Sequence, residues 1–162
     1  MTWDEFRDRL AQALRALTPR CYLIVSASGE PGYVQFAAGG DALQAEAAGP
    51  RFVTGPAAHA ADDPALTGAG WTAPTAAQPN WSYELPIPAL TSEYAALAGR
   101  CVVALRDVYG LAGPGVLSYR AWREPETQPA GVTWSPERFG ELDPGEDPLP
   151  LPGLGLAAES AG

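Results

Sequence analysis

The sequence contains no lysine, because all ten of its basic residues are arginines. A phosphate-binding loop of the Walker type requires a lysine, and a pyridoxal cofactor forms its Schiff base on a lysine amine. Both chemistries are therefore excluded. No apolar run approaches the roughly 18 residues needed to span a bilayer, and the first residues, "MTWDEFRDRL", have no apolar signal core. We therefore expect a cytoplasmic protein that does not enter a membrane.

Histidine is almost as scarce, since the only one is His59, in the segment "PAAHAADDP". His59 with Asp62 and Asp63 does not match the ligand spacing of a metal site, so a solvated loop is the better interpretation. No serine lies in a Gly-x-Ser-x-Gly turn that a histidine base could activate. Glu84 and Glu93 could be imagined as the two carboxylates of a glycosidase, but nothing in the sequence raises or orients either one. We predict no catalytic residue, no metal and no cofactor.

Cysteine occurs only twice, as Cys21 and Cys101, and no Cys-x-x-Cys pair exists. Both cysteines lie within apolar runs, where buried free thiols are more common than a disulfide. Free thiols are consistent with a reducing cytoplasm.

Positive charge is also in short supply, because the net charge is −9. Residues 1–122 have eleven acidic residues and eight arginines, whereas residues 123–162 have eight acidic residues and two arginines. An acidic chain without a basic patch repels phosphate backbones, so nucleic acid is excluded as a partner.

An amphipathic helix is predicted at the start of the chain, in "TWDEFRDRLAQALRAL" (2–17). Thr2 and Glu5 fit a capping box, and Pro19 ends the helix. Its apolar residues recur at spacings of three and four and define one helical face: Trp3, Phe6, Leu10, Leu14 and Leu17.

Three short β-like runs follow, at residues 21–27, 33–38 and 42–48. The tight turns "GEPG" (29–32) and "GGD" (39–41) separate them, so an antiparallel meander is predicted. The third run is rich in alanine and could be helical by propensity, but the tight turn before it favours a strand.

A connection rich in Gly, Pro and Ala spans residues 49–80 and contains one helical turn near residues 62–66. A strand is predicted at 81–85, with Trp81, Tyr83 and Leu85 on one face. Pro86 and Pro88 stop this strand.

A second helix is predicted at residues 92–110, capped by Ser92 and ended by Gly110. A last strand follows at 116–122. Tyr94, Leu97, Cys101, Leu105 and Val108 form the apolar stripe of the helix. The chain is therefore predicted to form an α+β domain over residues 1–123, with the order α-β-β-β-β-α-β and an antiparallel sheet of about five strands packed against helices.

Residues 124–162 form an acidic tail rich in Pro and Gly, which predicts a largely extended or disordered segment. A short helix is expected near 135–142, with Ser135 at the N-cap and Pro136 at the first helical position. Trp134 can pack against Phe139 across the first turn. Because disordered segments rarely keep such rings without burying them, we expect Trp134 and Phe139 to dock onto the domain or onto a partner.

Five aromatic residues outside the helices are candidates for binding a partner: Trp71, Trp81, Tyr83, Tyr119 and Trp122. They either bury themselves and fix the 49–80 connection in place, or stay partly open and bind a peptide, since Trp and Tyr are frequent in binding hot spots. Gly70 before Trp71 indicates a close backbone approach and favours burial there.

The order of these elements resembles that of the actinobacterial TY-Chap domains, which are similar to YbjN proteins and to type III secretion chaperones. The resemblance covers about residues 2–123. It rests on "YVQF" (33–36), Glu46, "GWTAP" (70–74), "PNW" (79–81) and "VLSYRA" (116–121).

The resemblance implies a non-catalytic domain, with a sheet packed on helices, that binds an unknown client peptide or protein. Type III secretion chaperones are commonly homodimers that hold an extended segment of an effector, so a homodimer is expected. Two alternatives remain: an interaction subunit whose own tail, through "TWSPERF" (133–139), occupies the groove, and an enzyme with an unrecognised site.

Overall fold

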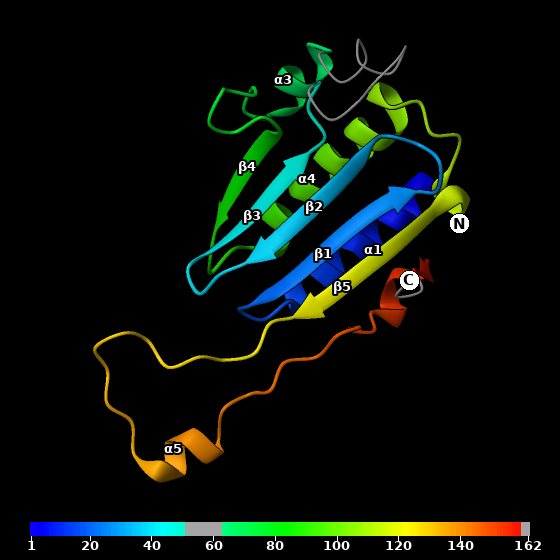
Figure 1. Ribbon diagram of the computed structural model, residues 1–162. Helices are drawn as coiled ribbons and strands as arrows, with labels where there is room; N and C mark the ends of the chain where they lie inside the picture. The colour runs from blue at the N-terminus through cyan, green and yellow to red at the C-terminus, as the bar shows by residue number, and fades with distance from the viewer. Residues whose placement is uncertain (51–62, 160–162) are drawn as a thin grey trace.

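The structure is a computed structural model that describes residues 1–50 and 63–159. It contains one six-stranded sheet in the order β4-β3-β2-β1-β5-β6 (Figure 1). Neighbouring strands are antiparallel except β5 and β6, which are parallel. The strands are β1 (Cys21–Ala27), β2 (Tyr33–Ala38), β3 (Ala42–Ala47), β4 (Trp81–Pro86), β5 (Leu117–Arg123) and β6 (Ala157–Ala158).

Two long helices, α1 and α4, lie side by side against one face of the sheet (Figure 1). The helical segments are α1 (Trp3–Ala16), α3 (Ala65–Ala69), α4 (Thr91–Val102), the π-helical η1 (Val103–Val108), the 3-10 turns η2 (Pro114–Val116) and η3 (Pro152–Leu154), and α5 (Pro136–Gly140). The α+β class and the meander are confirmed. The expected count of about five strands misses β6, because this strand comes from the tail and has no apolar pattern of its own.

The capping box of α1 is confirmed. The backbone N–H of Glu5 donates to the Thr2 hydroxyl at 3.1 Å, and the N–H of Thr2 donates to the Glu5 carboxylate at 2.6 Å. Phe6, Leu10 and Leu14 of the predicted face are fully buried.

The second helix differs from its prediction at both ends. Ser92 is not the cap, because Leu90 holds the N-cap position and its N–H donates to the Glu93 carboxylate at 2.6 Å. The α-helix also ends at Val102 and continues as the π-helical η1, whose wider turn still directs apolar side chains inward. The predicted stripe is buried throughout: Tyr94, Leu97, Cys101, Leu105 and Val108.

Both cysteines are free and buried in the core. Burial raises the pKa of the Cys101 thiol, because the apolar surroundings disfavour its thiolate. Cys101 is therefore a packing residue rather than a nucleophile.

Asn80, only 4% exposed, joins the two ends of the long connection before β4. Its carbonyl oxygen accepts the Gly49 N–H at 2.9 Å, and its amide donates to the Glu46 carboxylate at 3.1 Å and to the Tyr33 hydroxyl at 3.2 Å. A side chain at position 49 would lie 2.0 Å from the Pro79 carbonyl oxygen, so the backbones meet too closely for any residue but glycine.

Trp71 anchors the connection to α4. Its indole N–H donates to the Arg100 carbonyl at 3.1 Å, and the Arg100 guanidinium donates to the Ala69 carbonyl at 3.0 Å. Gly70 has a φ of 102°, and a side chain there would collide with Arg100. Trp81 begins β4, and its ring is buried in the same core. The aromatic residues of this connection thus attach it to the domain.

We expect Asn80→Ala to lower the free energy of unfolding by roughly 2 kcal/mol, because the buried Gly49 N–H and the Glu46 carboxylate both lose a partner. Urea unfolding followed by circular dichroism measures the change. Gln44→Ala is the matched control, since Gln44 donates to Glu84 in an exposed hydrogen bond; equal losses in the two variants would contradict the assignment.

Candidate functional site

The strands alternate between two faces of the sheet. In β1, Cys21, Leu23, Val25 and Ala27 are buried, whereas the residues between them are partly exposed. The buried set faces α1 and α4 (Figure 1). In the part of the chain that the structure describes, no helix covers the opposite side, which we name the open face (Figure 1).

Strand pairing brings the side chains of Tyr22, Ala37 and Trp122 together at the centre of the open face. Tyr22 of β1 lies opposite Ala37 of β2 and Trp122 of β5. Directly opposed residues of an antiparallel pair project to the same side, so the three side chains are neighbours. By strand register, the open face consists of Tyr22, Ile24, Ser26, Tyr33, Gln35, Ala37, Gln44, Glu46, Ser82, Glu84, Ser118, Arg120 and Trp122.

Tyr22 and Trp122 form a stacked pair, with ring centroids 5.2 Å apart and an interplanar angle of 12°. The Arg120 guanidinium lies 4.8 Å from the Trp122 ring and extends this stack. The Tyr22 hydroxyl donates to the Glu124 carboxylate at 3.4 Å. Desolvation, with the charge of Glu124, raises the pKa of Tyr22, so the phenol stays neutral.

A hollow of about 230 Å³ adjoins the stacked pair. Its walls are mostly apolar, with the Gln35 amide and the Glu46 carboxylate as polar groups, and Asn80 holds Glu46 in place. This volume is below the roughly 300–1,000 Å³ of typical small-molecule sites. It suits one or two side chains of a larger ligand. The residues around it are Tyr22, Ile24, Gln35, Phe36, Ala37, Glu46 and Trp122.

Of the five aromatic residues that the sequence predicts as candidates for partner binding, Trp122 lies on the open face. Trp71 and Trp81 are each 3% exposed within the core. Tyr83 packs against the core under the Arg100 guanidinium, which lies 4.1 Å from its ring. The Tyr119 hydroxyl is buried and accepts the Leu151 N–H at 2.8 Å. Their assignment to partner binding stays a prediction, and the structure does not bring the five residues together.

Tyr22 is the functional candidate that sequence reasoning missed. The sequence predicts a strand at "CYLIVSA" (21–27) but no exposed side for it. The signal was the position of Tyr22, Ile24 and Ser26 at alternate residues, which places a Tyr and a Ser on one side of the strand. An aromatic ring next to a polar residue on the same side indicates a half-exposed face.

The rings of the tail contact each other. Trp134 and Phe139 have centroids 6.0 Å apart, and Ser135 caps α5 by accepting the Arg138 N–H, as predicted. Phe139 is 45% exposed, and α5 lies away from the sheet (Figure 1). Docking of these rings onto the domain or a partner stays a prediction.

The candidate catalytic groups have structural partners where the structure describes them. Glu84 accepts the Gln44 amide, Glu93 caps α4, and Asp63 accepts the Ala65 N–H. His59 and Asp62 lie outside the described residues. Across residues 1–50 and 63–159, no group of three His, Cys, Asp or Glu side chains could hold a metal ion.

Both edges of the sheet are partly occupied. At the β4 edge, Thr72 and Ser82 exchange backbone hydrogen bonds of 2.8 and 3.1 Å, and Pro86 has no N–H to offer. At the β5 edge, residues 143–159 of the tail take the outward backbone groups. The open face, unlike these edge positions, is available to a ligand without displacing part of the chain.

The open face and the core should respond differently to loss of an indole. We expect Trp81→Ala to lower the free energy of unfolding by about 3–5 kcal/mol, because it leaves a cavity. Trp122→Ala should cost about 1 kcal/mol, mainly through lost stacking on Tyr22. Urea denaturation of both variants tests this, and similar losses would show that Trp122 is a core residue.

Comparison with known protein families gives one match. The family model TY-Chap3, described as "T3SS (YopN, CesT) and YbjN peptide-binding chaperone 3", matches residues 1–123. No curated protein and no solved structure matches the chain. Among the described residues, no helix is long and apolar enough to cross a membrane.

Proposed function

We propose that this chain, which belongs to the TY-Chap3 family of peptide-binding chaperones, holds an extended segment of a partner protein on its open face. The observation that carries the proposal is the stacked pair of Tyr22 and Trp122, partly exposed beside an apolar hollow. Aromatic rings of this kind provide large contact areas and supply most of the binding energy at protein interfaces.

The side chains of the open face indicate which kind of segment it would bind. An aliphatic or aromatic side chain fills the hollow beside Tyr22 and Trp122. Gln35 and Glu46 on its polar side hydrogen-bond to the backbone of the segment, and Arg120 attracts a carboxylate or carbonyl oxygen. Because these groups sit on four adjacent strands, β5, β1, β2 and β3, the segment crosses the sheet.

The proposal assigns binding rather than catalysis. Glu84 and Glu93 serve structural hydrogen bonds, and the hollow is smaller than a typical substrate pocket. We also propose a cytoplasmic location, supported by the two free thiols, and a homodimer, supported by the resemblance to type III secretion chaperones. Light scattering measures the oligomeric state directly.

In the alternative, the chain's own tail is the ligand. The part of the tail that contacts the sheet is not the part that the sequence predicted. Residues 133–139, "TWSPERF", lie away from the sheet (Figure 1). Residues 143–159 instead run along the edge of β5.

Selection of random dodecamer peptides on the full chain tests the open face. We expect the selected peptides to be rich in aliphatic and aromatic residues. Trp122→Ala should weaken their binding by roughly thirtyfold, the effect of a hot-spot residue, as measured by fluorescence anisotropy.

Glu84→Ala is the matched control, since Glu84 shares the open face but lies on β4, which β3 and β2 separate from β1. Binding that resists Trp122→Ala and Tyr22→Ala alike would refute the assignment of this surface.

A further inference from the structure

The tail returns to the domain after the excursion that carries α5. Residues 143–149 run antiparallel to β5 (Figure 1). Arg123 and Glu146 exchange backbone hydrogen bonds of 2.7 and 2.9 Å, and the Leu149 N–H donates to the Ala121 carbonyl at 2.8 Å. Further along, the Glu159 N–H donates to the Tyr119 carbonyl at 2.8 Å. The tail thus satisfies an edge that would otherwise be open to another strand.

Two arginines clamp one end of this segment. The Asp143 carboxylate accepts from Arg123 at 2.6 Å and from Arg20 at 2.9 Å. The hydrogen bond from Arg123, with that from the Gly145 N–H, holds the pKa of Asp143 well below its usual range. Charge-assisted bonds of this kind fix position and orientation.

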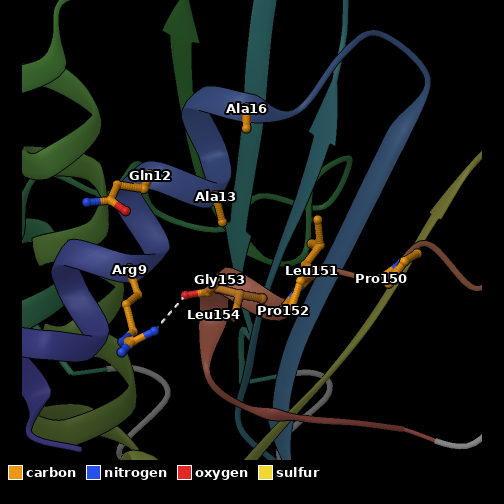
Figure 2. Close-up of a pocket in the computed structure, with 9 residues that line it drawn as sticks. All are labelled: Arg9, Gln12, Ala13, Ala16, Pro150, Leu151, Pro152, Gly153 and Leu154. Atoms are coloured by element: carbon orange, nitrogen blue, oxygen red, sulfur yellow. Dashed lines mark hydrogen bonds between the residues drawn. The ribbon is translucent and has the colours of Figure 1, made fainter.

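A leucine anchors the other end. Leu154 is 0% exposed and belongs to the main core, although it lies outside the matched domain. Figure 2 shows the segment around Leu154 beside α1, where the Arg9 guanidinium donates to the Gly153 carbonyl at 3.1 Å. Leu154 and the hydrogen bond from Arg9 thus anchor the segment on α1, and Leu149, Leu151 and Leu156 pack against the core as partly buried side chains.

The contact between segment and domain is incompletely packed. A hollow of about 220 Å³ lies between residues 150–154 and one side of α1 (Figure 2). A second hollow of about 290 Å³ lies between the segment and β5, bounded by Tyr119, Pro148 and Leu149. Both hollows are open to solvent rather than enclosed. The segment therefore covers α1 and β5 only in part, as a peptide bound at a surface does.

The segment also has the composition of a peptide ligand. Pro144, Pro148 and Pro150 disfavour helix and keep this part of the backbone extended, whereas Pro152 begins the short 3-10 turn η3. An extended chain loses less conformational entropy on binding.

We propose that the β5 edge is a peptide-binding site, that residues 143–159 are its resident ligand, and that a partner segment of the same chemistry displaces them. Such a segment is extended and rich in proline. It carries a carboxylate that binds Arg20 and Arg123, and a leucine that takes the buried position of Leu154 beside α1. This site rests on the proposed function and adds a second peptide-binding site to the one on the open face. The tail occupies this second site until a partner segment displaces it.

A nicked full chain tests the site. A protease recognition sequence is inserted between the exposed residues Gly131 and Val132 and cleaved, so that the fragment from Val132 onward is held only by its contacts. We expect a labelled synthetic peptide of residues 141–159 to exchange with this fragment, as measured by anisotropy. The domain should keep its near-ultraviolet circular dichroism once the fragment has left.

Substituted peptides test which side chains the β5 edge recognises. Leu154→Ala in the peptide should weaken competition by roughly a hundredfold, because a fully buried leucine is truncated. Asp143→Asn should weaken it less and reduce its salt dependence. A peptide that keeps only the Asp143, proline and leucine positions should still compete, whereas a scrambled peptide should not.

Two results would overturn the proposal: unfolding of the domain when the fragment leaves, which makes residues 143–159 part of the fold, or equal competition by the scrambled peptide. Trp122→Ala in the nicked chain separates this site from the open face. Peptide exchange at the β5 edge should survive that substitution, whereas binding of the selected dodecamers should not.

Discussion

Burial of only one face of the sheet is the constraint on which the rest of the structure depends. Two helices, α1 and α4, cover the apolar side of β1, β2 and β3, and the period of two along each strand directs every other residue away from them. The helices of residues 1–50 and 63–159 leave the other side of the sheet uncovered. The second face therefore remains available, and its aromatic pair is stabilised by stacking rather than by burial.

The long connection between β3 and β4 is compatible with this layout because it is held at a few points. Asn80 joins Gly49 to β3, and Trp71 attaches the residues before β4 to the end of α4. The same Asn80 orients Glu46, which borders the hollow on the open face. Asn80 thus both holds the long connection in place and positions the Glu46 carboxylate of the candidate site. A substitution of Asn80 would therefore affect stability and binding together.

Edge protection links the domain to its tail. An antiparallel sheet with free edges can pair with other chains, and this chain covers part of the β4 edge with Thr72 and the β5 edge with residues 143–159. The β4 cover is continuous with the domain. The β5 cover is different, because it is acidic, rich in proline, bordered by two open hollows and outside the family match. The proposed displacement of this cover would expose the β5 edge to a partner segment.

The sequence by itself determined the elements whose signals are local. The capping box of α1, the turns of the meander and the stripe of α4 all follow from residues close together in the chain. Burial of Trp71 was also favoured, because Gly70 indicated a close approach. Only the tertiary structure decided which rings share a surface: Tyr22 and Trp122 are one hundred positions apart, and only the register of β1 with β5 makes them neighbours. Likewise, the tail's pairing with β5 could not be predicted, because its backbone hydrogen bonds and its single buried leucine leave no periodic pattern in the sequence.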